Sequence, residues 1–116
     1  MIDLLFVYGT LRGRFGNRYA EMLRAEARFL ATATVSGSIF LISDYPGYRP
    51  DPPGSVQGEL YRLSDPDRLI PILDEYEGPD FERVLIDVAG QAAWIYQFRS
   101  RPPIAARIAS GDFCAL

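Results

Sequence analysis

Two stretches of the chain combine apolar, β-branched and aromatic residues without helical spacing. The first, Ile2–Tyr8, is closed by Gly9 and predicts a buried strand. The second, Phe29–Ile42, is mostly β-branched, small or apolar and contains Gly37. Glycine inside such a run often marks a bulge or a bend. We therefore expect one long bent strand or two strands, with Gly37 at the irregular position.

Helical spacing of apolar residues begins after Asn17, whose side chain can cap a helix. Gly13 and Gly16 indicate a loop before it. The apolar side chains that would share one face of this helix are Tyr19, Met22 and Leu23. The segment therefore predicts a short helix packed through that face.

A second helical segment lies between Ser64 and Gly78. We expect Ser64 to cap its first turn and Gly78-Pro79 to end it, because proline cannot continue a helix. Pro71 removes one helical donor, so it predicts a short or irregular first turn. The apolar stripe that would be buried consists of Leu69, Ile72, Leu73 and Tyr76.

The other segments predict strands and one loop. Ser43–Ser55 is rich in proline and glycine, which indicates a loop. Val56–Leu63 alternates its side chains between two faces, as a strand does. Phe81–Val88 and Ala92–Phe98 predict two strands, joined by a tight hairpin at Gly90-Gln91.

Composition agrees with a small globular domain. The chain has 116 residues, of which 48% are hydrophobic, so a core is expected. Predicted strands outnumber predicted helices, and neighbouring strands are linked by hairpins. We therefore expect one α+β domain over residues 1–116, a small mixed β-barrel or strongly curved sheet flanked by short helices.

Charge and hydropathy exclude several kinds of partner. The formal net charge is −3, whereas phosphate binding needs clustered basic residues. No apolar run is long enough to span a bilayer. Asp3 stands where a secretion signal would carry basic residues. We therefore expect a cytoplasmic protein that binds neither nucleic acid nor membranes.

The residue types that are missing restrict the chemistry. The chain has no His, and all 12 of its basic residues are Arg. A Schiff-base lysine, a Ser-His or Cys-His pair and the common zinc sites are therefore excluded. We expect Cys114 to be a partly buried small apolar residue. Acid–base work falls to Asp, Glu or Tyr, and we expect neither a metal nor a cofactor.

Tyr8-Gly9-Thr10-Leu11-Arg12 is the first candidate binding segment. A strand that turns sharply at glycine exposes N–H groups that can hold a carboxylate or a developing oxyanion. Thr10 could add a hydroxyl donor, and Arg12 could add charge. The alternative is an ordinary turn that ends a strand, with a solvated arginine.

Three acidic residues at the end of the second predicted helix are the candidate bases. Glu77 faces the negative pole of the helix, which raises a carboxyl pKa, and burial beside Tyr76 would add to this effect. Asp74 and Glu75 are expected at the surface. Helix position alone does not select among the three.

Together the two segments resemble the γ-glutamylcyclotransferase-like family. Tyr8–Arg12 carries the glycine turn, and Leu73–Gly78, which is Leu-Asp-Glu-Tyr-Glu-Gly, carries the second motif. Tyr45-Pro46-Gly47 and Ser110–Phe113 resemble further segments of the family, and the order of predicted elements fits over nearly the whole chain.

The resemblance implies the family fold and a cofactor-free intramolecular acyl transfer. The α-amine of a small γ-glutamyl compound attacks its own γ-carbonyl, which gives 5-oxoproline and a free amine or amino acid. It implies Glu77 as the acid/base and the backbone of Tyr8, Gly9, Thr10 and Leu11 as the glutamyl-binding segment. The substrate supplies the nucleophile, so no Ser, Cys or Lys nucleophile is needed.

One position departs from the family, which often has Tyr where this chain has Phe81. Arg83 is a candidate clamp for a substrate carboxylate, or else an exposed strand residue. Tyr45, Tyr48 and Tyr96 are possible pocket walls or core residues. The rival functions are a non-catalytic binding module for a small acidic ligand and a structural or partner-binding domain. The leaving group and the oligomeric state stay open.

Overall fold

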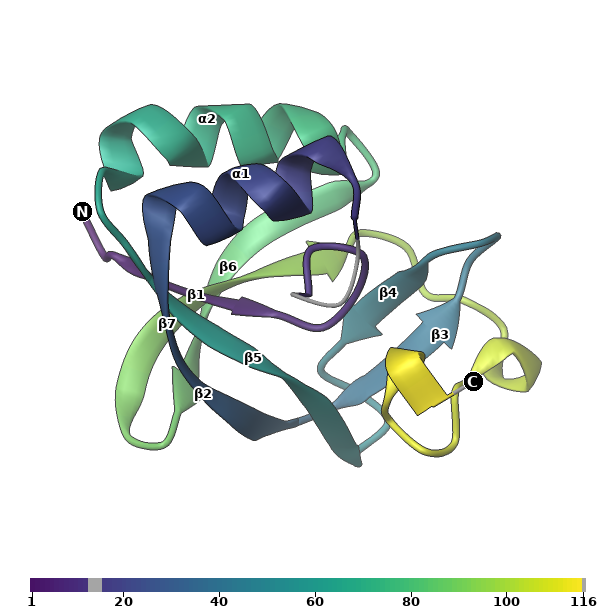
Figure 1. The fold of residues 1–116 in the computed structure, drawn as a ribbon. Coiled ribbons are helices and arrows are strands. Elements are labelled where there is room, and N and C mark those ends of the chain that lie inside the picture. Colours follow the sequence, from purple (N-terminus) through teal and green to yellow (C-terminus); the bar gives the residue numbers. More distant parts are fainter. Residues whose placement is uncertain (13–15, 116) are drawn as a thin grey trace.

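One sheet that mixes parallel and antiparallel strands curls around the core (Figure 1). The computed structural model describes residues 1–12 and 16–115, and within these the sheet has seven strands. The strands are β1 (Leu4–Val7), β2 (Ala27–Ser36), β3 (Ser38–Leu41), β4 (Pro46–Arg49), β5 (Ser55–Leu63), β6 (Phe81–Val88) and β7 (Gln91–Phe98). The predicted class, a strongly curved α+β sheet with short helices, is confirmed.

The two α-helices of the described residues lie side by side over one face of the sheet (Figure 1). They are α1 (Arg18–Glu26) and α2 (Pro66–Glu77), and two short 3₁₀ turns follow at Ile104–Ala106 and Phe113–Ala115. None of these helices is both long and apolar enough to cross a bilayer. The loop prediction at Gly13 falls outside the described residues.

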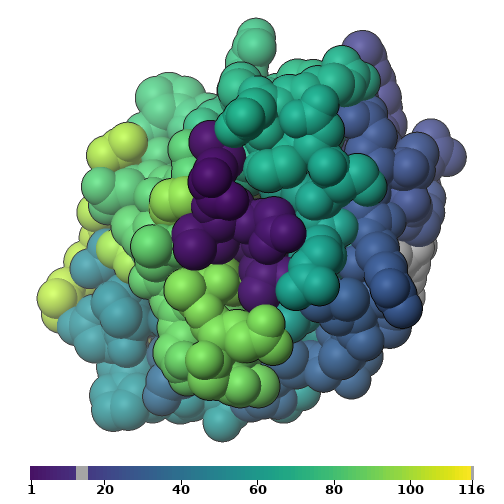
Figure 2. Space-filling model, turned by 90° about the vertical axis from the view of Figure 1, so that its left-hand side faces the viewer, coloured from purple at the N-terminus to yellow at the C-terminus, as the bar shows by residue number. Residues whose placement is uncertain are grey.

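β1 is the central strand of the sheet. It pairs antiparallel with β5 and parallel with β7, and the order across the sheet is β2-β5-β1-β7-β4-β3, with β6 on β7. Figure 2 shows the start of the chain, in purple, between the teal of β5 and α2 and the green of β6 and β7. The residues that follow β1 therefore lie close to several elements of the fold.

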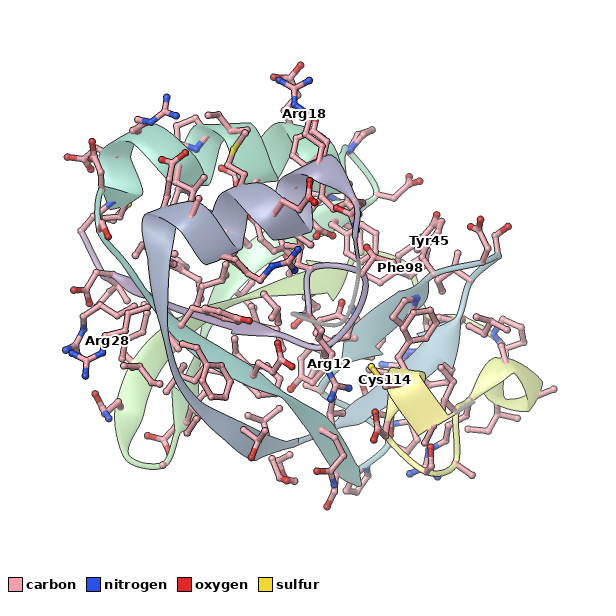
Figure 3. The ribbon with its side chains drawn as sticks, in the orientation of Figure 1. Arg12, Arg18, Arg28, Tyr45, Phe98 and Cys114 are labelled. Atoms are coloured by element: carbon pink, nitrogen blue, oxygen red, sulfur yellow. The ribbon has the colours of Figure 1, made fainter. Side chains whose placement is uncertain are left out.

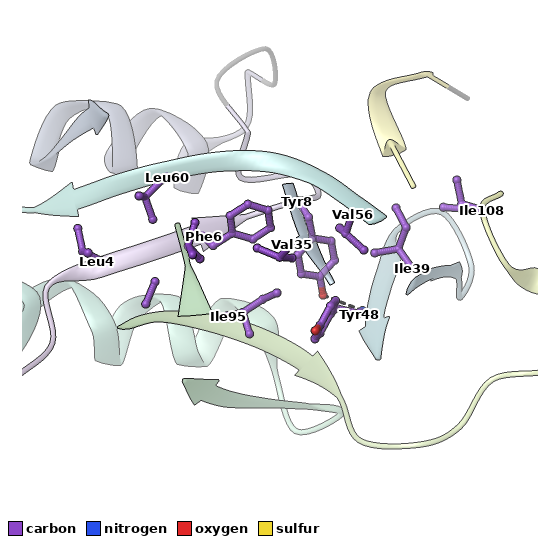
Figure 4. Close-up of a cluster of buried hydrophobic side chains, with 12 residues drawn as sticks. Leu4, Phe6, Tyr8, Val35, Ile39, Tyr48, Val56, Leu60, Ile95 and Ile108 are labelled. Atoms are coloured by element: carbon purple, nitrogen blue, oxygen red, sulfur yellow. Dashed lines mark hydrogen bonds between the residues drawn. The ribbon is translucent and has the colours of Figure 1, made fainter. Parts of the chain in front are cut away.

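Both faces of the sheet are buried, in two separate clusters. One cluster lies inside the curl and includes Phe6, Tyr8, Val56 and Ile95 (Figure 4). The other packs the opposite face of β1 and β5 against the helices and includes Leu5, Leu23 and Leu73. β1 thus contributes neighbouring residues to both cores, which explains its unbroken apolar run.

Several predicted local features are confirmed. Asn17 caps α1, since its Oδ1 accepts hydrogen bonds from the amides of Tyr19 and Ala20. Gly37 separates β2 from β3 and has a φ of 132°, which favours glycine. Gly78 caps α2 with a φ of 82°. The hairpin turn lies one residue earlier than predicted, at Ala89-Gly90, where both residues have positive φ.

The loop prediction for Ser43–Ser55 was wrong in part, because this segment contains β4 (Pro46–Arg49). β4 pairs antiparallel with β3 and parallel with β7. Proline is compatible with a strand at its first residue, and Pro46 stands there. Gly47 is needed for close packing, since a Cβ there would lie 2.9 Å from the Cβ of Phe98.

The start of α2 also differs from the prediction. Asp65 rather than Ser64 caps the helix, and Pro66 takes the first helical position. Pro71 lies inside the helix on an exposed face, so the first turn is not shortened. Ile70 is buried in place of Ile72, which is half-buried.

Candidate active site

A cavity of about 390 Å³ opens where β1 ends beside α2. Its walls come from the end of β1 and the next turn, the segment leading into β4, the last turn of α2, and the strands β6 and β7. The lining residues are Phe6, Val7, Tyr8, Gly9, Thr10, Leu11, Asp44, Tyr45, Pro46, Tyr76, Glu77, Phe81 and Tyr96. The structure therefore brings the two sequence motifs to one cavity.

The turn after β1 is closed by its own backbone. The amide of Arg12 donates to the carbonyl oxygen of Gly9 at 3.1 Å, and Asn17 Nδ2 donates to the carbonyl oxygen of Thr10 at 2.7 Å. The amides of Gly9, Thr10 and Leu11 donate no hydrogen bond to any other residue that the structure describes. Within the part of the chain that the structure describes, these amides are therefore available to a ligand, and their residues line the cavity.

Glycine is required at position 9 by close approach rather than by a left-handed backbone. A Cβ on Gly9 would lie 2.9 Å from Cγ and 3.2 Å from Cδ of Pro46, the first residue of β4. The turn and β4 therefore touch directly. The sequence analysis predicted the sharp turn, and the contact with Pro46 explains why a larger residue would disturb it.

Tyr8 ties together three elements around the cavity. Its hydroxyl donates to the carbonyl oxygen of Tyr96 at 2.6 Å. The same hydroxyl accepts from the amide of Tyr48 at 3.0 Å, and Figure 4 shows Tyr8 and Tyr48 together. Burial raises the pKa of Tyr8 well above its ordinary value, so the hydroxyl stays protonated. The end of β1 is thereby joined to β4 and β7.

A pair of hydroxyl groups lies on another side of the cavity. The hydroxyls of Thr10 and Tyr76 are 2.5 Å apart, and the ring of Tyr76 stacks on Tyr19 of α1 with centroids 4.4 Å apart. The contact links the glycine turn to the last turn of α2. Thr10 was predicted to offer a hydroxyl donor to a ligand; in the structure this hydroxyl is paired with that of Tyr76, and its role toward a ligand stays a prediction.

Glu77 is the last residue of α2 and faces the cavity. It follows Ile70 and Leu73 at the spacing of one helix face, so the apolar stripe of the helix ends in a carboxylate. Its pKa is raised to about 7, first by burial and then by the negative charge of Asp74. Its carboxylate accepts no hydrogen bond from the other residues that the structure describes.

Residues 5–115 match the model of the family described as "Gamma-glutamyl cyclotransferase, AIG2-like". The chain belongs to this family. It is 30% identical to the gamma-glutamylcyclotransferase family protein YtfP of Escherichia coli K12 over 112 residues, which are 94% of each chain.

Solved structures of other proteins share the fold of this chain. The crystal structure of the uncharacterized protein PH0828 from Pyrococcus horikoshii has a TM-score of 0.80 and 25% identity, covering 97% of this chain and 90% of that one. The solution NMR structure of YtfP from Escherichia coli has a TM-score of 0.66 and 30% identity, covering 94% of each chain. The family assignment thus agrees with the curled sheet.

Arg83 was predicted to bind a substrate carboxylate. In the structure it binds the carboxylate of Asp74. Its Nε and Nη2 donate to Asp74 Oδ1 at 2.9 Å and Oδ2 at 3.2 Å. Its guanidinium carbon lies 4.2 Å from the centre of the Trp94 ring. Arg83 lines a second hollow on the other side of Glu77, not the cavity that holds Gly9. Its role as a clamp for substrate stays a prediction.

Asp74 was expected at the surface, and the structure places it there, but with partners that the sequence did not predict. It is half-exposed, yet Arg83 and the hydroxyl of Tyr96 both donate to it, the latter at 2.8 Å. The partners come from β6 and β7, far along the chain, so helix position could not reveal them. Glu75 is exposed, as expected.

Arg12 is directed away from the cavity lining. Its Nη1 lies 2.7 Å from Asp112 Oδ1, and its Nε lies 3.8 Å from Glu59 Oε2. Figure 3 shows Arg12 beside the C-terminal segment that carries Cys114, which is half-buried, as predicted. Arg12 therefore fastens the glycine turn to the C-terminal segment.

Aromatic residues form the cavity wall opposite the glycine turn. Phe81 is buried and packs edge-on against Phe98 with ring centroids 5.4 Å apart, and Tyr45 lies 6.0 Å from Phe81. Figure 3 shows Tyr45 and Phe98 close together at this wall. Tyr45 and Tyr96 line the cavity, whereas Tyr48 is in the core. Phe81 brings an apolar edge where the family often has a hydroxyl.

Proposed function

We propose that the chain is a cyclotransferase that converts a small γ-glutamyl amine or γ-glutamyl amino acid to 5-oxoproline and the free amine. The observation that carries the proposal is that Glu77, with a pKa raised to about 7, lines one cavity with Gly9, Thr10 and Leu11, whose amides donate to none of the other residues that the structure describes. Family membership supports the same class of reaction.

Glu77 is the acid/base in this proposal. Its carboxylate takes a proton from the α-ammonium group of the substrate, and the α-nitrogen then attacks the γ-carbonyl carbon. A carboxyl group whose pKa lies near neutral pH is suited to accept and return a proton. As the lactam C–N bond forms and the bond to the leaving nitrogen breaks, Glu77 returns its proton to that nitrogen. The reaction consumes no water.

The turn from Tyr8 to Leu11 supplies the binding and the charge stabilisation. Attack on the γ-carbonyl places negative charge on its oxygen, and backbone N–H donors fixed before the reaction stabilise such an oxyanion. Folding the glutamyl group within a cavity of about 390 Å³ brings the amine and the carbonyl together. The tie from Tyr8 to β4 and β7 keeps these donors in place.

The test is to incubate the protein with γ-glutamyl amines and γ-glutamyl amino acids and to measure 5-oxoproline by chromatography. Glu77→Gln keeps the shape of the side chain and removes proton transfer, so turnover should fall by roughly 10²- to 10⁴-fold. Glu75→Gln is the matched control, because Glu75 is an exposed carboxylate on the same helix. Wild-type turnover in Glu77→Gln would reject the assigned role.

A thermal-shift screen with the same compounds separates catalysis from binding. Compounds that raise the melting temperature but give no 5-oxoproline would favour a non-catalytic binding module for a small acidic ligand. Product from any of them favours the cyclotransferase.

A further inference from the structure

Asp74 lies one helical turn before Glu77, in the second of two neighbouring hollows. Glu77, Phe81 and Tyr96 line both hollows, whereas Asp74 and Arg83 line only the second. The carbonyl oxygen of Asp74 also accepts the hydrogen bond from the amide of Gly78 that ends α2. Asp74 and the proposed acid/base, Glu77, thus share the second hollow.

Three donor groups fix the carboxylate of Asp74. Arg83 donates through Nε and Nη2, at 2.9 and 3.2 Å, in the paired arrangement that makes such bonds strong and directional. The hydroxyl of Tyr96 adds a third hydrogen bond of 2.8 Å. Trp94 stacks on the guanidinium and limits its movement. An ordinary half-exposed aspartate would instead move between rotamers.

The charged and titratable groups near Glu77 are mostly acidic or neutral. Those that line the two hollows are Tyr8 after β1, Asp44 and Tyr45 before β4, Asp74, Glu75 and Tyr76 on α2, Glu82 and Arg83 on β6, Tyr96 on β7 and Arg99 after β7. Arg83 is bound to Asp74, and Arg99 lies 3.8 Å from Glu82. Both cations among these groups are therefore paired with other acids.

We propose that Asp74 is a positioning residue, a fixed negative charge held by Arg83 and Tyr96 one helical turn from Glu77 that keeps Glu77 exchanging its proton at neutral pH. The catalytic meaning of this role rests on the proposed function. The coupling between the two carboxylates stands apart from it, because like charges at this spacing disfavour each other's ionised forms.

The direction of each effect follows from the charges. Asp74 contributes to the raised pKa of Glu77, as the second cause after burial. Asp74→Asn removes the charge and keeps an oxygen for Tyr96 and Arg83, so the pKa of Glu77 should fall. Arg83→Gln removes the cation that offsets Asp74, so the pKa of Glu77 should rise. A merely structural role would not shift this pKa in opposite directions.

The pKa of Glu77 can be measured without turnover. The free energy of unfolding is determined by urea at several pH values for the wild type, Asp74→Asn, Arg83→Gln and the control Glu75→Gln. Each is compared with the same protein carrying Glu77→Gln. The pH dependence of the difference is fitted with the unfolded pKa held at its ordinary value, which gives the midpoint for ionisation of Glu77 in the folded protein. The pH profile of 5-oxoproline formation is measured in parallel for the proteins that retain Glu77.

We expect the midpoint to fall by about half a pH unit or more in Asp74→Asn, to rise in Arg83→Gln and to stay in Glu75→Gln. An unchanged midpoint in Asp74→Asn, or shifts of the same sign in both variants, would overturn the inference. If Asp74→Asn does not fold, the test depends on Arg83→Gln. A higher midpoint for Glu77 in this variant supports the inference, and a lower or unchanged midpoint rejects it. If the midpoints shift as expected but neither the wild type nor any variant forms 5-oxoproline, the proposed function is rejected. The coupling between Asp74 and Glu77 is then still supported.

Discussion

The hydroxyl of Tyr8 donates a hydrogen bond of 2.6 Å to the carbonyl oxygen of Tyr96. The hydroxyl oxygen of Tyr8 also accepts a hydrogen bond of 3.0 Å from the amide of Tyr48, and all three residues are buried. β4 and β7 share only a short parallel pairing, at Tyr48 and Gln97. The phenol of Tyr8 therefore supplies contacts between strands that the sheet ladder alone does not.

Replacing Tyr8 with Phe should destabilise the protein and loosen the cavity wall. The change leaves a buried carbonyl and a buried amide without this partner, which costs roughly 1–3 kcal/mol of unfolding free energy. Urea denaturation at pH 7 measures the loss. Tyr45→Phe is the control, because Tyr45 is half-buried at the cavity and its hydroxyl has no hydrogen bond to the residues that the structure describes. Equal stability of both variants would contradict this account of Tyr8.

The two halves of the site could be predicted from sequence because each is local. The run Ile2–Tyr8 is closed by Gly9, and a capping glycine follows Glu77 at the end of an amphipathic helix. The spacing from Ile70 and Leu73 to Glu77 is a further local signal that this carboxylate is buried. The choice of Glu77 among three acids still depended on resemblance to a family.

The missed features depend on contacts between distant segments. β4 contains Pro46 and Gly47 and has no alternating pattern, so only its pairing with β3 and β7 defines it. The ion pair of Asp74 with Arg83 requires β6 to lie beside α2. The cap at Asp65 is different, because Pro66 after it was a local signal that favoured Asp65 over Ser64.

Glu77→Gln should make the protein more stable than the wild type at alkaline pH. The pKa of Glu77 is about 7 in the folded state, against an ordinary value of 4.5, so the folded state binds the proton more tightly. The stability contributed by this proton is complete below pH 4.5 and is lost as the pH rises through about 7. The wild type thus loses at most about 3 kcal/mol that Gln at this position does not lose.

Urea unfolding at pH 4 and pH 8 checks this difference. The free energies of unfolding of the wild type and Glu77→Gln should be similar at pH 4, and Glu77→Gln should be the more stable at pH 8. Glu75→Gln should show no such gain, because Glu75 is exposed. A wild type that is the more stable of the two at pH 8 would show that the carboxylate of Glu77 makes favourable contacts in the folded protein.

The activity should rise with pH through the same range. Only the ionised form of Glu77 can take a proton from the substrate ammonium, so kcat/KM should increase tenfold per pH unit below about pH 7 and level off above it. Initial rates of 5-oxoproline formation between pH 5 and 9 give the profile. An acid limb centred near 4.5, the ordinary value, would mean that the group governing the rate is not the buried Glu77.

Gly9→Ala should lower both the stability of the protein and its turnover. The new Cβ would lie 2.9 Å from Cγ of Pro46, so the turn and the start of β4 must move apart. Overpacking of this kind costs roughly 1–3 kcal/mol. The displaced amides would form poorer hydrogen bonds with the γ-glutamyl group. A misplacement of about 1 Å can lower the rate by around 10²-fold. Steady-state kinetics and urea unfolding measure the two effects separately.

Gly16→Ala is the matched control for Gly9→Ala. Gly16 lies in the same connection between β1 and α1, and a Cβ there would meet no atom within 4 Å. Its kinetics and stability should match the wild type. If Gly9→Ala turned over substrate as fast as Gly16→Ala, the amides of the turn would not act on the reacting carbonyl. The loss of kcat/KM in Gly9→Ala should also persist at pH 8, where Glu77 is ionised, because the defect lies in the turn and not in proton transfer.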